Sequence, residues 1–425
     1  MTYSTETQCL IGGWSPKNGD PRTLPITQST TYKYESSEHM ARLFDLAEAG
    51  YLYSRIHNPT VDSAAAKICA LEGGAAAMLT SSGQAASFFA LFNICSAGDH
   101  FVCLSTIYGG TVNLFAVTMK RMGIDCTFVS PDAVDEELNA AFRPNTKAFF
   151  AESIANPAMV VLDFERYVAA AHAHGVPIIV DNTFPTPINC RPFEYGADIV
   201  THSTTKYMDG HATCVGGAIV DSGNFDWEKY ADKFSELTTP DESYHGVTYT
   251  RDFGKGAYIT KAVVQLMRDL GAMPSPISAF MLNTHLESLA VRMERHCASA
   301  KKVAQFLAEH PKVNYVNYPG LEGDKYYQLA QKYMPKGTCG VINFGVAGGR
   351  EKAAAFMDSL KLCYIATHVA DARTCVLYPA GTTHRQLTDE QLEKAGVGID
   401  TVRISVGLED AQDIIGDIAQ ALTRV

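Results

Sequence analysis

Several side chains in this sequence have the types that a carbonyl cofactor acting on amino acids requires. Such chemistry needs a lysine amine to form an imine, a carboxylate facing the ring nitrogen of the cofactor, donors for an anionic group, and an aromatic ring that stacks. Lys206, Asp181 and Tyr108 supply three of these groups. An anionic Asp181 would keep a ring nitrogen protonated and so make the ring a better acceptor of electrons.

Small polar residues supply candidate donors for the anionic group. Ser203 and Thr205 lie three residues and one residue before Lys206. Gly83 and Gln84 begin a segment with helical spacing. The free N–H groups and the dipole at a helix N-terminus suit a phosphate. The sequence therefore predicts an anion site without a Walker lysine.

Ordinary structural explanations exist for each residue taken alone. A lysine after a strand is usually a solvated loop residue, and an aspartate at a strand end often caps a helix. The segment Ser203 to Lys206 also matches the SxxK element of penicillin-recognising enzymes, but the SDN and KTG partners are absent and the motif follows a strand. His172 and His174, two residues apart on a predicted helix, point to different faces and predict no metal site.

The elements that must position these residues alternate in type from about Leu71 to Asp221. Apolar runs of strand length (AAAMLTS, HFVCLS, AFFAES, VPIIVDN, ADIVTHS) are separated by segments with helical spacing (GQAASFFALFNIC, TVNLFAVTMKRMG, FERYVAAAHAHG). This alternation is typical of βαβ units that form a mainly parallel sheet covered on both faces. Ligand sites lie beyond the carboxyl ends of such strands, which is where Glu152, Asp181 and Lys206 fall.

The rest of the chain predicts two further segments. Residues 1–64 contain turn formers and aromatic residues without a clear core period, so we expect an arm that packs on something else. Residues 65–270 hold the predicted sheet. Residues 271–425 contain a long helical region and then strand runs (VNYVNYP, GVINFGV) and helices (REKAAAFMDSL, DAQDIIGDIAQAL). The sequence predicts an α/β protein with a large mainly parallel-sheet domain and a smaller C-terminal α/β domain.

Composition excludes several other classes of protein. The 425 residues are 46% hydrophobic and 19% charged, as in a globular protein of two cooperating domains. The net charge of -11 comes from dispersed acids, so neither nucleic acid nor a membrane is an expected partner. Eleven cysteines are scattered singly, which predicts mostly buried reduced thiols. The sequence shows no membrane-spanning or signal segment, so we expect a cytoplasmic location. The expected partners are small molecules and further copies of this chain.

Ordered motifs along essentially the whole chain resemble one family. They are TLPITQSTTY, YSRIHNPT, ALEGG, SSGQAA, YGGTVNLF, DNTFPTP, GADIVTHSTTKYMDGH, PDESYHGVTYTRDFG and VRISVGLED. With these motifs the sequence resembles the Cys/Met metabolism (trans-sulfuration) family of pyridoxal 5'-phosphate (PLP) enzymes, and within it the O-acetylhomoserine sulfhydrylase branch. The resemblance implies PLP fold type I, the aspartate aminotransferase-like fold, with PLP as the cofactor.

The resemblance also implies a role for each site residue. Lys206 would form the Schiff base, with Asp181 at the ring nitrogen and Tyr108 stacked on the ring as the third catalytic group. The implied cofactor-binding set is Lys206, Ser82, Gly83, Gln84, Tyr108, Asp181, Thr183, Ser203 and Thr205, completed by Tyr53 and Arg55 from a neighbouring subunit. Such a shared site makes a dimer the smallest catalytic unit, and the family commonly pairs dimers into tetramers.

The substrate side is likewise expected from the resemblance. Arg403 matches the arginine that binds the substrate α-carboxylate, for which its planar fork is well suited. His368 and Tyr53 are expected to contact the substrate as well. The family pattern has Asn-Val-Gly-Asp where this chain reads His368 to Asp371, often a histidine where Tyr378 stands, and glycine at His285. These changes are expected near the substrate and predict an effect on the choice of nucleophile.

The implied reaction is γ-replacement on O-acetyl-L-homoserine. The Lys206 amine moves protons from Cα and Cβ, the γ-acyloxy group leaves, and sulfide or methanethiol adds to give homocysteine or methionine. One alternative is an amine or carbon nucleophile that builds a non-standard amino acid, and another is γ-elimination as in methionine γ-lyase. Gly109-Gly110 after Tyr108, where those lyases have Gly-Cys, and the long stretch from Phe225 to Gly256 favour replacement. Acetyl and succinyl leaving groups both stay open. A non-catalytic binding protein would have no need of this full set of catalytic residues.

Overall fold

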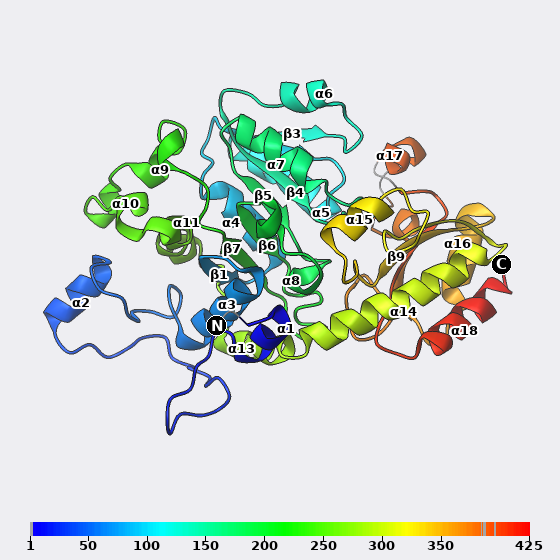
Figure 1. Ribbon diagram of the computed structural model, residues 1–425, viewed down its shortest axis with the longest axis horizontal. Coiled ribbons are helices and arrows are strands. Elements are labelled where there is room, and N and C mark those ends of the chain that lie inside the picture. The colour runs from blue at the N-terminus through cyan, green and yellow to red at the C-terminus, as the bar shows by residue number, and fades with distance from the viewer. Residues whose placement is uncertain (1–2, 384, 386–387, 395–396) are drawn as a thin grey trace.

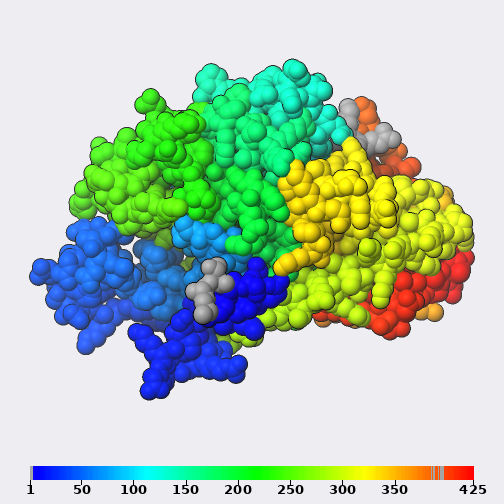
Figure 2. All heavy atoms as spheres, viewed as in Figure 1, coloured from blue at the N-terminus to red at the C-terminus, as the bar shows by residue number. Residues whose placement is uncertain are grey.

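Two sheets organise the protein. The computed structural model describes residues 3–383, 385, 388–394 and 397–425, which form one seven-stranded and one five-stranded sheet. The long helix α14 (Leu289–Glu309) runs from the larger body to the smaller one (Figure 1). In the space-filling view the C-terminal residues form one end of the molecule and the N-terminal residues lie along the edge of the other (Figure 2).

The larger sheet is mainly parallel, as predicted. Its strands lie in the spatial order β1 (Ala76–Thr80), β7 (Gly217–Asp221), β6 (Ile199–His202), β5 (Ile178–Asp181), β4 (Thr146–Glu152), β2 (His100–Leu104) and β3 (Asp125–Val129). Strands β6, β5, β4, β2 and β3 run parallel, while β7 is antiparallel to both of its neighbours. Strands β3 and β7 were not among the predicted strands.

Helices cover both faces of this sheet, also as predicted. Successive side chains of a strand point to opposite faces, and on β4 the fully buried Phe149 and Phe150 belong to different apolar cores. One core is completed by α3 (Pro59–Glu72), α7 (Phe164–Ala173) and α13 (Pro276–Leu286). The other is completed by α4 (Gly83–Phe92), the π-helical turn Leu114–Met119 that continues α5 (Gly109–Asn113), and α11 (Ala257–Lys261).

Shorter helices connect these elements. They are α6 (Asp135–Ala140), α8 (Thr186–Asn189), α9 (Ser235–Thr238), α10 (Tyr249–Phe253) and α12 (Arg268–Leu270). The turn before α4 illustrates local control by sequence, because Ser82 accepts a hydrogen bond from the N–H of Ala85 and so caps the helix at its start. This cap fixes where the first N–H groups of α4 point.

The smaller sheet forms the C-terminal domain. Its strands lie in the order β10 (Tyr364–Ile365), β11 (Cys375–Leu377), β12 (Thr401–Ser405), β9 (Val341–Val346) and β8 (Val313–Asn317), and only β10 and β11 pair in parallel among them. The accompanying helices are α14, α15 (Tyr327–Tyr333), α16 (Gly349–Asp358), α17 (Asp389–Lys394) and α18 (Ala411–Leu422). Phe344, Phe356 and Ile418 are fully buried in its own core. The predicted smaller α/β domain is therefore present.

The N-terminal residues divide into a docked and an extended part. Helix α1 (Thr5–Ile11) packs against α3 and α14 of the same chain, and its Cys9 is fully buried. Helix α2 (Ser37–Phe44) lies at the far left of Figure 1, away from both sheets. The predicted boundary between residues 64 and 65 falls inside α3, and α13, which follows residue 270, packs against α3. The division into three segments stays a prediction.

Two general expectations can be compared with the fold. All eleven cysteines are free, eight of them buried and three partly buried, which confirms the predicted buried thiols. Among the described helices, none combines the length and the apolar character that crossing a membrane requires.

Candidate active site

A cavity of about 240 Å³ lies where the predicted functional residues meet. Its walls come from the carboxyl ends of β4, β5 and β6, the start of α4, and β12 of the smaller domain. The lining residues used below are Ser82, Gly83, Gln84, Tyr108, Glu152, Asn156, Asp181, Thr183, Ser203, Thr205, Lys206 and Arg403. Cavities of about 500 and 710 Å³ lie beside the N-terminal segment, but neither contains Lys206. We locate the chemistry in the smaller cavity because the titratable groups converge there.

Lys206 follows β6 in a tight turn, so its amine stands beyond the end of the strand. Burial, and next the nearby Arg403 charge, lower the pKa of the Lys206 amine to about 8. No hydrogen bond or ion pair to this amine is found within the described parts of the chain. An amine that loses its proton near pH 8 and faces a cavity is suited to attack a carbonyl.

Asp181 ends β5 and is held by Thr183. Thr183 Oγ1 and its N–H both donate to Asp181 Oδ1, and Thr183 Oγ1 in turn accepts from the N–H of Ser203 at 2.8 Å. Burial raises the pKa of Asp181, although the Thr183 hydrogen bond and the neighbouring His202 act in the opposite direction. A cation placed against Asp181 would therefore be strongly favoured.

The start of α4 and the Lys206 segment form a close-fitting concave wall. A Cβ added at Gly83 would lie 2.6 Å from Ser203 Cβ, so only glycine allows the two segments to approach this closely. Gln84 Oε1 accepts from Thr111 Oγ1 at 3.1 Å, and Thr205 Oγ1 both donates to and accepts from the backbone of Gly216. Gly83 and Gln84 line the cavity at the start of α4, where backbone N–H groups have no acceptor within the helix, as an anion site requires.

Glu152, at the end of β4, joins two walls of the cavity. Its Oε1 accepts from the N–H of Tyr108 at 2.7 Å and its Oε2 accepts from the N–H of Asn156 at 3.0 Å. Burial, and next the Asp181 carboxylate, raise the pKa of Glu152 well above its usual range. The sequence placed Glu152 at a strand end but assigned it no role. Its position at the end of an apolar run was the available signal.

Arg403 enters the cavity from β12 of the smaller domain. Its Nη1 donates to Asn156 Oδ1 at 3.1 Å, while its buried Nε has no partner among the described residues. Burial lowers the pKa of Arg403 to about 10, and the guanidinium is still cationic at neutral pH. A buried cation with an unpaired N–H is suited to bind a carboxylate. Asn156, which sequence reasoning missed, carries no signal of its own beyond its place after β4.

Other predicted residues lie outside the cavity. Tyr53 is 40% exposed, and the Arg55 guanidinium lies over its ring, 5.0 Å from the ring centroid. Arg55 lines the 500 Å³ cavity, and neither residue lines the cavity that contains Lys206. His368 stands between two lining residues, Thr367 and Val369, and its buried Nε2 has no partner among the residues described. Burial, and next the Lys206 charge, lower the pKa of His368.

Two departures from the family pattern do not face the cavity. Tyr378 is buried in the core of the smaller domain and donates to the carbonyl of Ile399 at 2.7 Å. Its expected place beside the substrate is therefore wrong, because this core takes up the ring. His285 contacts Asp209, in the turn that follows Lys206, and does not line the cavity. Ala370 has a positive φ of 64°, a conformation that glycine adopts more easily.

The fold and the site together define a PLP-dependent enzyme of fold type I. A family model described as Cys/Met metabolism PLP-dependent enzyme matches residues 6–423, and the chain belongs to this family. The expected family, fold class and cofactor are confirmed.

Individual relatives are similar along nearly their whole length. The chain is 47% identical to homocysteine synthase from Schizosaccharomyces pombe, over 98% of this chain and 97% of the relative. It is 43% identical to O-acetyl-L-homoserine sulfhydrylase from Leptospira meyeri, over 100% of this chain and 97% of the relative. A crystal structure of a putative O-acetylhomoserine (thiol)-lyase from Campylobacter jejuni, which carries a pyridoxyl-lysine monophosphate, matches with a TM-score of 0.95 at 37% identity, covering 99% of this chain and 100% of that one.

The donor set of the cavity fits PLP. Lys206 offers an amine for the aldehyde, Asp181 a carboxylate for the ring nitrogen, and the wall of Gly83 and Ser203 backbone a cradle for the phosphate. Tyr108, half exposed at the start of α5, offers a ring for stacking. These residues meet in one cavity although they come from segments far apart in the chain.

Proposed function

We propose that this chain catalyses γ-replacement on O-acetyl-L-homoserine, with sulfide or a thiol as nucleophile, to give homocysteine or methionine. The observation that carries the proposal is one cavity that combines Lys206, Asp181 and Arg403 in a chain similar over its full length to homocysteine synthase and O-acetyl-L-homoserine sulfhydrylase. The enzyme is accordingly a PLP-dependent transferase. In the reaction, the Cγ–O bond breaks, acetate leaves with the electron pair, and sulfur forms the new bond to Cγ.

Lys206 has two tasks in this proposal. When bound, PLP supplies a carbonyl for covalent attachment and a ring that accepts electron density from the substrate. Lys206 holds that carbonyl in the resting enzyme. With substrate bound, the Lys206 amine, whose pKa is lowered to about 8, would take protons from Cα and Cβ of the substrate and return them. Asp181 keeps the ring nitrogen protonated throughout, and Tyr108 stacks on the ring and assists the proton transfers.

The remaining residues orient cofactor and substrate. We assign the phosphate to Ser82, Gly83, Gln84, Ser203 and Thr205, with Thr183 holding Asp181 in place. Arg403 takes the substrate α-carboxylate, because this buried cation lines the cavity and its Nε has no partner among the described residues.

One assay separates this reaction from its alternatives. Purified holoenzyme is incubated with O-acetylhomoserine plus sulfide or methanethiol, and in parallel with O-succinylhomoserine, methionine or cystathionine, and products are identified by mass spectrometry. We expect homocysteine and methionine from the acetyl substrate. Prompt 2-oxobutyrate and ammonia from methionine without any replacement product would overturn the proposal in favour of γ-elimination.

A second candidate is replacement by an amine or carbon nucleophile. It is favoured by His368, which stands beside the cavity with a buried Nε2 that lacks a partner in the described structure and a lowered pKa. A neutral imidazole there is suited to accept a proton from an incoming nucleophile. The same incubation with a panel of amines and stabilised carbanions tests this, and a product only with sulfur nucleophiles would refute it.

We further propose a dimer or tetramer with shared sites. Tyr108 and Val215, which line the cavity, are 50% and 67% exposed, so the cavity is open on that side. Tyr53 and Arg55 of a neighbouring subunit would close it, reaching the phosphate and the substrate from the N-terminal segment 1–64. In this proposal the chain divides into the N-terminal segment 1–64, a PLP-binding domain 65–270 and a small domain 271–425. A cytoplasmic location is supported by eleven free thiols, which persist in reducing compartments.

A further inference from the structure

The turn that carries Lys206 is organised around a buried carboxylate. Asp209, three residues after the lysine, has no exposed surface. Its Oδ2 accepts from the N–H groups of Thr213 at 2.9 Å and His211 at 3.3 Å, and its Oδ1 accepts from Thr213 Oγ1 at 2.7 Å. Burial acts to raise the pKa of Asp209, but the hydrogen bonds from Thr213 and His285 outweigh it and leave this pKa lowered. Asp209 is therefore ionised at neutral pH.

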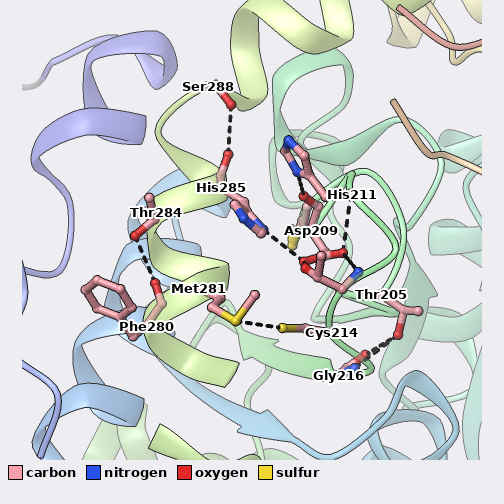
Figure 3. Close-up of polar contacts among 12 residues, drawn as sticks. Thr205, Asp209, His211, Cys214, Gly216, Phe280, Met281, Thr284, His285 and Ser288 are labelled. Carbon is pink, nitrogen blue, oxygen red and sulfur yellow. Dashed lines mark hydrogen bonds and ion pairs between the residues drawn. The ribbon is translucent and has the colours of Figure 1, made fainter. Parts of the chain in front are cut away.

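One further hydrogen bond to Asp209 comes from outside the turn. His285 Nδ1, in the last turn of α13, lies 2.9 Å from Asp209 Oδ1 (Figure 3). A carboxylate can only accept, so the imidazole donates and its Nδ1 carries the proton. The side chain of His285 is 19% exposed and that of Asp209 0%, so this hydrogen bond to a carboxylate is largely shielded from water.

The His285 ring also contacts His211, a histidine of the turn that contains Asp209. The His211 and His285 ring centroids are 4.3 Å apart at an interplanar angle of 34°, and His211 Nδ1 donates to the Asp209 carbonyl at 2.6 Å. Figure 3 shows the two rings side by side above Asp209, with Cys214 approaching Met281 below. The imidazole of His285 thus fits between α13 and the turn.

Asp209 is coupled directly to the backbone around Lys206. The N–H of Asp209 donates to the carbonyl of Thr204 at 2.9 Å, and the N–H of Gly210 donates to the carbonyl of Lys206 at 2.7 Å. A displaced Asp209 side chain would therefore move the backbone on both sides of the lysine. Misplacing a reacting group by about 1 Å can cost on the order of 100-fold in rate.

Backbone contacts from two other elements hold the same turn. Arg292 of α14 donates from Nη1 to the carbonyl of Tyr207 at 2.6 Å, and the N–H of Ala372 donates to the carbonyl of Gly210 at 2.8 Å. These bonds fix the path of the chain but do not depend on the Asp209 side chain. Among the described residues, His285 is the side chain that connects α13 to the Asp209 carboxylate.

We propose that the buried Asp209–His285 pair is a positioning device that sets the turn bearing Lys206, so that His285, outside the cavity, controls how completely Lys206 is bonded to the cofactor. This inference rests on the proposed role of Lys206. It assigns a positioning role to α13, which does not line the cavity. His285 of this helix is 76 residues from Asp209 in the chain.

Two substitutions at one position test the inference. His285→Leu keeps much of the volume but removes the donor, and it leaves a buried carboxylate without its partner from α13. His285→Asn places an amide N–H where the imidazole Nδ1–H stands and restores the hydrogen bond without a ring. The measurements are PLP affinity from absorbance titration of cofactor-free protein, the fraction of Lys206 trapped as pyridoxyl-lysine by borohydride, and the melting temperature.

A second His–Asp pair provides the matched control. His172 Nε2 lies 2.8 Å from Asp198 Oδ2, and Asp198 precedes β6 at the end of the strand opposite to Lys206. His172→Leu therefore removes a comparable bond at a distance from the cofactor. We expect it to leave PLP affinity unchanged even where the melting temperature falls.

The expected pattern distinguishes positioning from general stability. His285→Leu should weaken PLP affinity roughly tenfold or more and reduce the trapped fraction, and His285→Asn should return the affinity to within about threefold of the wild type. The inference is wrong if His285→Leu binds PLP within twofold of wild type, or if His285→Asn is as weak as His285→Leu at equal melting temperature. Lys206→Ala, measured in parallel, should abolish trapping. A pyridoxyl group trapped at another lysine would overturn the role of Lys206 itself.

Discussion

Gly83→Ala is the sharpest test of the proposed phosphate wall. A Cβ built on Gly83 lies 2.6 Å from Ser203 Cβ, 2.8 Å from Ser203 Cα and 2.9 Å from Ser203 Oγ. Carbon atoms pack at roughly 3.5–4.0 Å, so one of the two segments has to move by about 1 Å. Two of these three atoms, Ser203 Cα and Cβ, are fixed by the backbone, so no side-chain rotation can move them away.

A displacement of Ser203 would be passed on through its hydrogen bonds to other residues of the site. The Ser203 N–H is bonded to Thr183 Oγ1, and Thr183 holds Asp181, so a shift of Ser203 disturbs the carboxylate as well as the lysine three residues on. Overpacking a well-packed site costs about 1–3 kcal/mol, which corresponds to roughly 5- to 150-fold in an equilibrium constant. We therefore expect PLP affinity to fall by about tenfold or more, and turnover at saturating PLP to fall on the order of 100-fold.

The assay is an absorbance titration of cofactor-free protein with PLP, followed by turnover of O-acetylhomoserine with sulfide. Gly416→Ala is the control, because a Cβ there meets no atom within 4 Å and the position is inside α18. That change should raise the free energy of unfolding by up to about 1 kcal/mol and leave PLP affinity unchanged. If Gly83→Ala binds PLP as tightly as Gly416→Ala, the reasoning about the wall is refuted.

Three further outcomes are expected. Asp181→Asn should lower kcat/KM for O-acetylhomoserine by roughly 100-fold or more, because a buried charge partner is removed; a loss of less than tenfold would contradict its role at the ring nitrogen. The rate at which cofactor-free protein captures PLP should rise with pH and level off above about pH 8, since the pKa of Lys206 is lowered to about 8 by burial and its uncharged amine reacts; stopped-flow rates still climbing past pH 10 would contradict this. Asp417→Asn should lower the free energy of unfolding in urea by about 2–3 kcal/mol at pH 7, because Asp417 Oδ2 accepts from the N–H groups of Leu362 and Cys363. The pKa of Asp417 is lowered in the folded state, so the difference in free energy of unfolding between wild type and Asp417→Asn should be largest above about pH 4 and shrink as the pH falls further. Activity at 25 °C should stay unchanged.

Local sequence rules predicted much of the larger sheet, and their failure at β7 has a physical cause. The predicted strands β1, β2, β4, β5 and β6 are all present, because each is an apolar run of strand length. Strand β7 was missed because it begins with Gly217, after Gly216, and paired glycines usually indicate a turn. Here they allow close approach, since a Cβ at Gly216 would lie 2.5 Å from Thr204 Oγ1 and one at Gly217 2.2 Å from the Ser82 carbonyl oxygen.

The sequence predicted those site residues that lie at or just after the end of a predicted strand. Lys206 and Asp181 follow adjacent parallel strands, and the cavity brings them together as that topology requires. Contacts between remote elements were not predictable. Glu152 bonds a backbone group 44 residues away, and the partner of Asp209 lies 76 residues away, so neither contact leaves a local pattern. Tyr378 was misplaced for the same reason, because its core neighbours are set by the packing of the smaller domain.

The cavity is built at the junction of the two domains, and this limits how it can open. Arg403 reaches Asn156 from the smaller domain, and the buried Tyr207, next to Lys206, accepts from the N–H of Gly340 at 2.7 Å. Helix α14 belongs to both bodies, because its Arg292 holds the Lys206 turn while its later residues, such as Val303, pack in the smaller domain's core. A wide hinge motion between the domains would break these buried hydrogen bonds, each worth about 1 kcal/mol or more. The cavity is open past the exposed Tyr108 and Val215, and completion of the site on that side by a neighbouring subunit, as proposed, breaks none of these hydrogen bonds.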